Sequence, residues 1–220
     1  MSRYDYEFER VNDYCYPDSY VLRNRFDIRD AETLNTAERE FVSAKLAYIK
    51  GNPIKGKFDL NHLCSIHRYL FCDIYDWAGE LRTVNIAKGN QFCNYIHLGT
   101  YAEGVFAKLK AEKRLSDTSS DTIPERLAYY LSEINVLHPF REGNGRTQRV
   151  FIEYLAQAAG WHTDFSDVSD REMIEASALA FALEYDMLIT MLRRIVTPIT
   201  PEEQRAFRVK LGLSRPARST

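Results

Sequence analysis

The sequence lacks several features that would assign it to a class at once. No apolar run in its 220 residues approaches the length needed to cross a bilayer, and the N-terminal stretch is too polar for a secretory signal. A formal net charge of −2 gives no general attraction to nucleic acid or to an anionic membrane. We therefore expect neither a direct nucleic-acid partner nor a membrane partner.

Cysteine is also scarce. The four cysteines are widely spaced and include no C-x-x-C pair: Cys15, Cys64, Cys72 and Cys93. This spacing is typical of reduced cysteines in a cytosolic protein rather than of a disulfide or zinc framework. We expect a cytoplasmic protein, with a translocated effector as the open alternative.

What the sequence does contain is helical periodicity. Apolar residues recur at helical spacing over residues 60–71 behind Asp59, over 127–137, and over 188–195. Residues 122–125, Thr-Ile-Pro-Glu, predict a capping box with a proline just inside a helix. The length suits one well-cored domain over residues 1–197, followed by a solvated C-terminal helix and basic tail over 198–220.

Residues 82–93 differ from the rest of the chain. β-Branched residues there flank a Lys88-Gly89-Asn90 turn, which predicts a short β-hairpin. A single hairpin in a helical protein cannot form a sheet core. We therefore expect a flap laid over another part of the molecule.

The stretch NVLHPFREGNGRTQRVF, residues 135–151, carries the chemistry. Pro139 disfavours helical backbone at His138, so the preceding helix is expected to end there. After the Gly-Asn-Gly run of residues 143–145, helical periodicity resumes. A glycine-rich loop thus leads into a helix N-terminus, where unpaired N–H groups and the helix dipole favour an anion.

The charged residues of this stretch extend the same argument. Arg146 and Arg149 lie one turn apart and suit phosphate groups, while Glu142 offers a hard oxygen ligand that suits Mg²⁺. Alone, a His-Pro pair or a Gly-Asn-Gly run is typical of a turn. Together, within twelve residues, they predict a polyphosphate site with a histidine at its edge.

The run from His138 to Arg149 resembles the active-site motif of Fic-domain proteins, and residues 77–82, Trp-Ala-Gly-Glu-Leu-Arg, with the hairpin resemble the flap region of that family. The resemblance covers about residues 14–197, the core of the expected domain. It implies a mainly α-helical Fic-like bundle with a small β-hairpin flap over the active site. It also implies a protein adenylyltransferase, which transfers AMP from ATP to a Tyr, Thr or Ser hydroxyl and releases pyrophosphate.

The resemblance also implies a role for each residue. His138 would be the general base, for which an ordinary imidazole pKa of about 6.5 is suitable. Phe140 would be a buried anchor and Glu142 a Mg²⁺ ligand, while Arg141 is assigned no role. Asn144, with the N–H groups of Gly143 and Gly145, would contact the α-phosphate. Arg146 would contact the β-phosphate and Arg149 the γ-phosphate. The flap would hold an extended target segment by β-augmentation, through Thr83, Val84, Asn85, Ile86, Lys88 and Gly89.

Regulation is expected to come from outside these 220 residues. Fic proteins are commonly restrained by a [Ser/Thr]-x-x-x-Glu-[Gly/Asn] motif, but here only Glu103 and Glu142 precede Gly or Asn, with Gly99 and His138 four residues earlier. We expect a separate antitoxin-like inhibitor protein. The target is expected to be a type II topoisomerase or a host GTPase, and no residue favours either.

Three alternatives are considered. A Doc-like phosphoryl transferase would have a lysine where this sequence has Gly145. Residues 51–57 match a P-loop only in part, because Phe58 replaces the required Ser or Thr, so we expect an ordinary loop. A non-enzymatic nucleotide-sensing module would not need His138. Outside the motif, His67 lies on an apolar helical stripe and is expected to be a satisfied core histidine.

Overall fold

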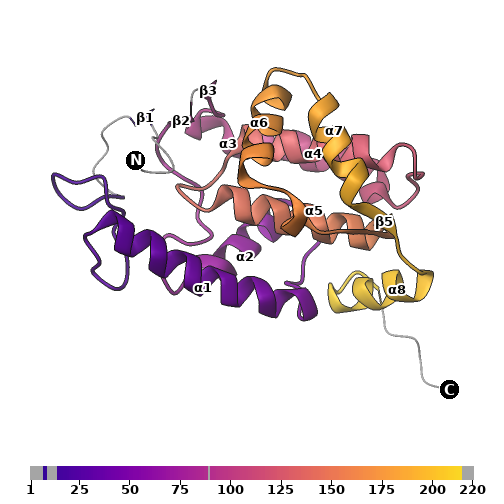
Figure 1. Ribbon diagram of the computed structural model, residues 1–220, viewed down its shortest axis with the longest axis horizontal. Coiled ribbons are helices and arrows are strands. Elements are labelled where there is room, and N and C mark those ends of the chain that lie inside the picture. Colours follow the sequence, from indigo (N-terminus) through magenta and orange to yellow (C-terminus); the bar gives the residue numbers. More distant parts are fainter. Residues whose placement is uncertain (1–6, 9–13, 89, 215–220) are drawn as a thin grey trace.

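The computed structural model describes residues 7–8, 14–88 and 90–214, which form a mainly helical protein (Figure 1). This confirms the predicted fold class. The α-helices of the described residues are α1 (Ala31–Gly51), α2 (Leu60–Phe71), α3 (Leu98–Ala111), α4 (Ile123–Leu137), α5 (Asn144–Ala159), α6 (Asp170–Phe181), α7 (Asp186–Ile195) and α8 (Pro201–Lys210). None of them is long and apolar enough to span a membrane.

Several helices begin at a side-chain cap. The Asp59 carboxylate accepts from the N–H of His62 at the start of α2, and the Ser169 hydroxyl caps α6 in the same way. The capping box predicted at Thr122 is wrong. Its hydroxyl lies 3.0 Å from the Ser119 hydroxyl and makes no cap hydrogen bond, so α4 begins with proline in its first turn but without a capped N–H.

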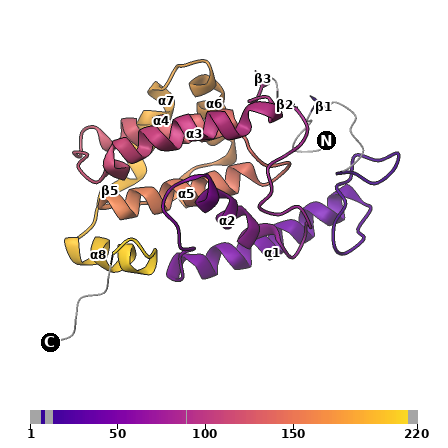
Figure 2. The same ribbon diagram turned by 180° about the vertical axis from the view of Figure 1, so that it is seen from behind.

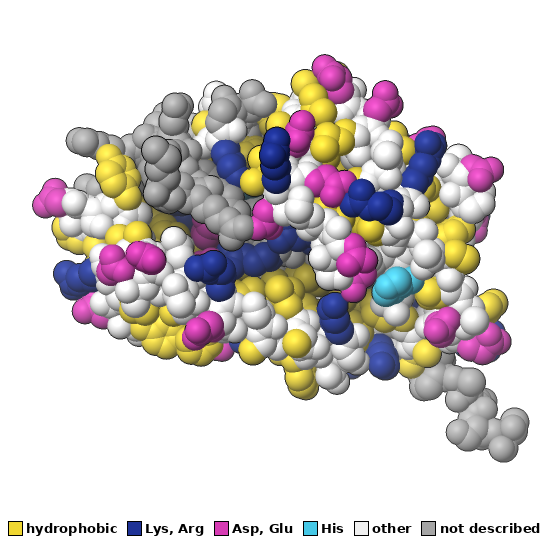
Figure 3. Space-filling model, viewed as in Figure 1, with side chains coloured by type: hydrophobic (Ala, Val, Ile, Leu, Met, Phe, Trp, Pro, Cys, Tyr) yellow, Lys and Arg dark blue, Asp and Glu magenta, His cyan; other side chains and the backbone are white. Residues whose placement is uncertain are grey.

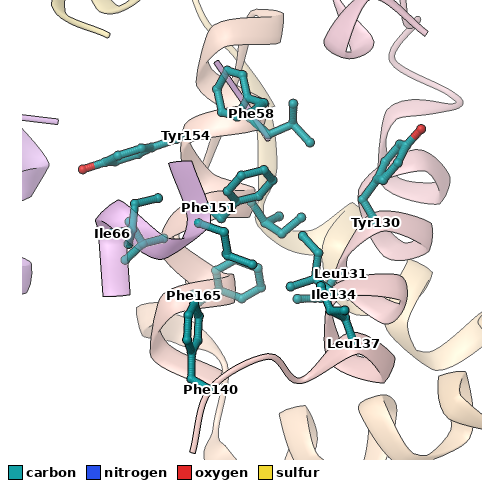
Figure 4. Close-up of a cluster of buried hydrophobic side chains, with 14 of the residues drawn as sticks. Phe58, Ile66, Tyr130, Leu131, Ile134, Leu137, Phe140, Phe151, Tyr154 and Phe165 are labelled. Atoms are coloured by element: carbon teal, nitrogen blue, oxygen red, sulfur yellow. The ribbon is translucent and has the colours of Figure 1, made fainter. Parts of the chain in front are cut away.

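Helix α5 is the centre of the fold. Phe151 and Leu155 on this helix have no exposed surface, and α2 and α4 pack on either side of it. In Figure 4, Phe151 lies among side chains from both neighbours, including Ile66 of α2 and Ile134 of α4. The half-buried positions of α5 follow one stripe, which contains Gly145, Arg149, Glu153 and Gln157. The helix therefore supports the site at its N-terminus from within the core.

Two small sheets accompany the helices. The first has the order β1 (Glu7–Phe8), β2 (Ile86–Lys88), β3 (Asn90–Gln91), all antiparallel. The second pairs β4 (Trp161–Thr163) with β5 (Val196–Pro198). The predicted hairpin is confirmed as β2 and β3, although Gly89 at its turn lies outside the described residues. Figures 1 and 2 both place β1 beside β2, a pairing that periodicity did not predict.

The C-terminal helix packs more closely than expected. Phe207 of α8 is buried, and its ring lies 5.6 Å from the ring of Tyr154 on α5. Gln204 and Arg208 both donate hydrogen bonds to the backbone oxygen of Ala158 at the end of α5. One face of α8 is therefore part of the core. Residues 215–220 of the predicted tail lie outside the described residues.

The loop after α1 has a structural role. The N–H of Gly56 donates to the backbone oxygen of Leu211, just after α8, at 3.3 Å. A Cβ atom on Gly56 would lie 2.1 Å from the His62 ring, so the glycine permits close packing there. The partial P-loop match of residues 51–57 is thus an ordinary loop, as predicted.

Candidate active site

His138 ends α4 in a left-handed conformation, with φ of 42° and ψ of 59°. Its N–H still bonds to Ile134 of the helix, and its ring Nδ1 lies 3.3 Å from the backbone oxygen of Asn135. The ring stacks on Phe92 of the flap, with centroids 3.8 Å apart. The imidazole is therefore fixed from two sides, by the end of α4 and by the flap.

The other ring nitrogen of His138, Nε2, lies in a different environment from Nδ1. If Nδ1 donates to Asn135, then Nε2 carries the lone pair, and this buried atom has no hydrogen-bond partner among the described residues. Burial, together with the charges of Arg82 and Lys88, lowers the pKa of His138 to about 3. This pKa lies far below the ordinary value near 6.5, so the imidazole is neutral at physiological pH.

Phe140 and His67 hold the loop that follows. Their rings stack with centroids 3.9 Å apart. The Nδ1 of His67 accepts from the N–H of Gly79, and its Nε2 lies 2.9 Å from the backbone oxygen of Glu142. Burial and the charge of Arg146 lower the pKa of His67 to about 3, so the ring is neutral. The predicted core histidine is confirmed, and it fastens the motif loop to α2.

Asn144 and Gly143 shape the start of α5. The Asn144 side chain accepts from the Phe140 N–H at 2.9 Å and donates to the Phe140 oxygen at 2.7 Å. Its amide therefore braces the loop, and the expected contact with the α-phosphate stays a prediction. Gly143 has φ of 79°, and a Cβ there would lie 2.3 Å from the Phe71 ring. Its N–H donates to the Glu142 carboxylate at 2.8 Å. The positive φ and the close approach of Phe71 both require glycine at position 143.

Arg146 is held by an acid that motif reasoning missed. Its Nη2 donates to the Glu38 carboxylate at 2.5 Å, and Glu142 lies 3.6 Å away. The Tyr75 hydroxyl donates to the other oxygen of Glu38, also at 2.5 Å. Glu38 is 6% exposed and lies between Leu34 and Val42 on the buried face of α1, so an acid within this apolar stripe is the sequence signal that it offers. The guanidinium of Arg146 also covers the Phe71 ring at 4.8 Å.

Arg149 lies over the first turn of α5. A Cβ on Gly145 would be 3.7 Å from Nη1 of Arg149, so the guanidinium folds back toward the helix N-terminus. The two motif arginines thus lie near the same helix end, as the spacing predicted. Figure 3 shows Lys and Arg side chains gathered in a recess near the centre of this face, above α1.

Glu142 is the only motif residue suited to a hard cation. Burial and the negative charge of Glu38 raise the pKa of its carboxyl, and Arg146 opposes that rise. Among the described residues, no group of three or more His, Cys, Asp or Glu is arranged for a metal ion. Mg²⁺ is commonly held by one or two carboxylates together with substrate phosphates. The residues therefore fit a cation that enters with a polyphosphate.

The flap is joined to His138 through Arg82, a second residue that spacing did not single out. This arginine is 2% exposed and donates to the backbone oxygens of His138 at 2.8 Å and Val84 at 2.6 Å, and to that of Cys93. Burial lowers its pKa to about 10, so the guanidinium is charged. One buried cation thus ties both ends of the flap to His138.

The predicted flap residues divide into two groups. Val84 and Ile86 are buried, so their side chains belong to the core rather than to a docking surface. Thr83 bonds to the Tyr14 hydroxyl through its N–H at 3.2 Å, and Asn85 accepts from the N–H of Tyr95 at 3.1 Å. Lys88 is half-buried on β2. What this segment offers a partner is therefore mainly backbone.

Comparison with known proteins agrees with this geometry. The pattern of the Fic/DOC family matches residues 57–156. The chain is 38% identical over 196 residues to protein adenylyltransferase VbhT of Bartonella schoenbuchensis, covering 88% of this chain and 41% of that protein. It is 35% identical to the probable protein adenylyltransferase y4lH of Sinorhizobium fredii, covering 83% of this chain and 94% of that protein.

Solved structures give the same result. The BepC protein of Bartonella tribocorum with bound AMPPNP superposes with a TM-score of 0.79 at 25% identity, covering 85% of this chain and 97% of the other. A Fic domain from Bartonella quintana with bound ADP has a TM-score of 0.79 at 26% identity, with coverage of 85% and 95%. The chain belongs to the Fic/DOC family. Like these relatives, the chain is a protein adenylyltransferase, which is one kind of nucleotidyltransferase.

Proposed function

We propose that this chain transfers AMP from ATP to a Tyr, Thr or Ser hydroxyl of a target protein. The observation that carries the proposal is the buried, neutral Nε2 of His138, which has no partner among the described residues and lies beside a helix N-terminus. A buried acceptor without a donor costs about 1–3 kcal/mol, which a substrate hydroxyl would recover by donating to it.

The chemical step has one proton and one phosphorus bond to account for. The target hydroxyl donates its proton to Nε2 of His138 as its oxygen attacks the α-phosphorus. The bond from that phosphorus to the bridging oxygen of the β-phosphate breaks, and pyrophosphate leaves. A base already neutral at pH 7 needs no prior deprotonation. Positioning and preorganised charge would supply most of the rate.

The N-terminus of α5 would bind the phosphates. The backbone N–H groups of Gly143 and Gly145, with the helix dipole, would face the α-phosphate, Arg146 the β-phosphate and Arg149 the γ-phosphate. The Gly143 N–H now bonds to the Glu142 carboxylate at 2.8 Å, so Glu142 would have to turn away first. Glu142 would hold Mg²⁺, which neutralises phosphate charge when bound.

The flap would hold the target. The backbone of β2 and β3, rather than the buried side chains of Val84 and Ile86, would pair with an extended segment. Replacing Ile86 by aspartate would therefore report on folding as well as on docking. A substitution that removes only a backbone donor of this sheet is the more specific test.

The partners are proposed on the same basis. The target would be a protein with an accessible hydroxyl, such as a type II topoisomerase or a host GTPase. A separate antitoxin-like protein would restrain the enzyme, since the sequence carries no self-inhibitory motif of the common kind. Strong self-inhibition of the purified chain, relieved by truncations that spare Arg149, would contradict this part.

The deciding experiment uses ATP labelled in turn at the α- and γ-phosphate, with Mg²⁺ and a bacterial lysate, for wild type and His138→Ala. Label on a protein band from α-labelled ATP only, lost in the variant, is the expected result. Label from γ-labelled ATP only would indicate a Doc-like phosphoryl transferase. No label in either case, with ATP still bound, would favour a nucleotide-sensing module.

A further inference from the structure

The flap already has a partner strand from its own chain. β1 pairs antiparallel with β2, with Glu7 opposite Ala87 and Phe8 opposite Ile86. β3 pairs with the other edge of β2. In the three-stranded sheet, β2 is therefore the central strand, and both of its edges are occupied (Figure 1).

The hydrogen-bonding pattern identifies which peptide groups face β1. The N–H of Phe92 donates to the backbone oxygen of Ile86 at 3.3 Å, so the peptide groups of Ile86 face the β3 side. Successive residues of a strand direct their N–H and C=O groups to opposite edges. Those of Ala87 therefore face β1, opposite Glu7, and it is this edge that an extended target would need.

Tyr14 keeps the N-terminal segment close to the flap. Its hydroxyl accepts from the N–H of Thr83 at 3.2 Å, and its ring meets Trp77 edge-on with centroids 5.7 Å apart. Only five residues separate Phe8 from Tyr14 along the chain. A tether this short gives β1 a high effective concentration at the edge of β2.

We propose that Glu7–Phe8 occupies the target-docking edge of β2, and that an extended segment of the target must displace it before modification. The partner is an unpaired peptide strand that carries a hydroxyl residue and runs antiparallel to β2, in the register that β1 now uses. The proposal rests on the proposed function, because it assumes docking by β-augmentation. A two-residue strand has few hydrogen bonds to exchange, which makes the displacement reversible.

The test removes one backbone donor. Glu7→Pro deletes the N–H that faces Ala87 and disrupts the pairing, whereas Glu7→Ala changes the side chain and keeps that donor. With α-labelled ATP and a bacterial lysate, Glu7→Pro should label the same target band about threefold to tenfold faster, the effect of one or two net hydrogen bonds. Glu7→Ala should match wild type, and equal stimulation by both would overturn the proposal.

A peptide supplies the converse test. A free peptide of the first thirteen residues, MSRYDYEFERVND, should slow target labelling by a chain that begins at residue 11. The same peptide with proline in place of Glu7 should not. Equal inhibition by both peptides, or by neither, would overturn the proposal. Thermal unfolding of each protein variant should match wild type.

Amide hydrogen exchange separates this proposal from the proposed function, because it needs no turnover. The Ala87 N–H should exchange faster in Glu7→Pro than in wild type or Glu7→Ala. Unchanged exchange would show that β1 does not cover this edge and would overturn the proposal while leaving AMP transfer intact. Faster exchange with unchanged target labelling would also overturn it, since pairing would then not compete with docking. Absence of label from every variant would instead contradict AMP transfer.

Discussion

The motif loop and the flap meet at His138, yet they are held in place by different means. The loop of residues 138–144 is fixed by side chains: Phe140 stacks on His67, and Asn144 bonds twice to the backbone of Phe140. The flap is two short strands joined to the body by backbone pairing and by the three hydrogen bonds of Arg82.

This difference matches the role proposed for each region. A base and its phosphate site work only if their atoms keep fixed positions, which buried packing and satisfied hydrogen bonds provide. A docking element must exchange one partner for another, which exposed backbone pairing permits. The comparison predicts that changes in the loop act on chemistry and stability, whereas changes in β1 act on target recognition.

The largest effect is expected from the base itself. His138→Ala should lower the rate of AMP transfer about 10²–10⁴-fold, the usual contribution of a general base. ATP affinity should stay close to that of wild type, because in the proposed mechanism Nε2 contacts the target hydroxyl rather than the phosphates. Single-turnover labelling and equilibrium ATP binding measure the two quantities. A variant that keeps the wild-type rate would remove His138 from the mechanism.

Arg82 tests the link between the two regions. Arg82→Met leaves three backbone oxygens without their donor, and each buried acceptor left in this state costs about 1–3 kcal/mol. We expect the free energy of unfolding to fall by at least about 3 kcal/mol in urea titrations. Arg193→Met is the matched control, because its ion pair with Glu125 is exposed and contributes about 0–1 kcal/mol. Equal losses in the two variants would contradict the role of Arg82.

Glu38 tests the support of the phosphate site. Glu38→Gln leaves Arg146 without its main partner and should lower the free energy of unfolding by about 3 kcal/mol, the lower end for a broken buried pair. ATP should stabilise this variant more than wild type, because phosphate would take the place of the lost carboxylate. Thermal unfolding with and without ATP measures both effects.

The control is Arg146→Gln in the Glu38→Gln background. It removes the unpaired charge, so the double variant should lose less stability than the sum of the single variants. Strict additivity would mean that the two residues do not act as a pair.

Two neighbouring glycines provide a matched pair within the loop. Gly143→Ala should lower the free energy of unfolding by at least about 1 kcal/mol, because its positive φ disfavours a side chain and its Cβ would meet the Phe71 ring at 2.3 Å. At Gly145 the nearest atom to a Cβ, the Arg149 Nη1, is 3.7 Å away, so Gly145→Ala should fold as well as wild type. Urea titration of both variants checks this, and equal losses would contradict the packing argument.

The last effect concerns pH. The folded-state pKa of His138, about 3, lies below the unfolded value near 6.5, so the unfolded chain binds the proton first as the pH falls. Its contribution to stability is therefore complete above about pH 6.5 and is lost as the pH falls toward 3. The stability difference between wild type and His138→Ala should shift by about 2 kcal/mol between pH 7 and pH 5, to the disadvantage of wild type. Glu153, whose pKa burial raises to about 7, affects both proteins equally and cancels.

Much of the site was predictable because it is local in the chain. The helix end at His138 follows from Pro139, and the α5 N-terminus follows from the glycine-rich run of residues 143–145. The hairpin of residues 82–93 and the core position of His67 were also predictable. The capping box at Thr122 was not, because the nearby Ser119 hydroxyl competes for the same side chain.

The contacts that could not be predicted join residues far apart in the chain. Glu38 and Arg146 are 108 positions apart in the sequence. Glu7 pairs with Ala87, and most of the N-terminal half of the chain lies between them. Neither pair has a spacing or periodicity that indicates it. The two hydrogen bonds between the Asn144 side chain and the Phe140 backbone were likewise not predicted from the motif.

By itself, the sequence determined which chemistry is present: a histidine after a helix, a glycine turn, two arginines and an acid, all within twelve residues whose φ restrictions and helical spacing act locally. Only the tertiary structure decided how those groups behave. Burial sets the pKa of His138, an acid from α1 holds Arg146, and a strand from the N-terminus covers the flap edge. These depend on desolvation and on pairing between distant segments, which arise only once the chain has packed.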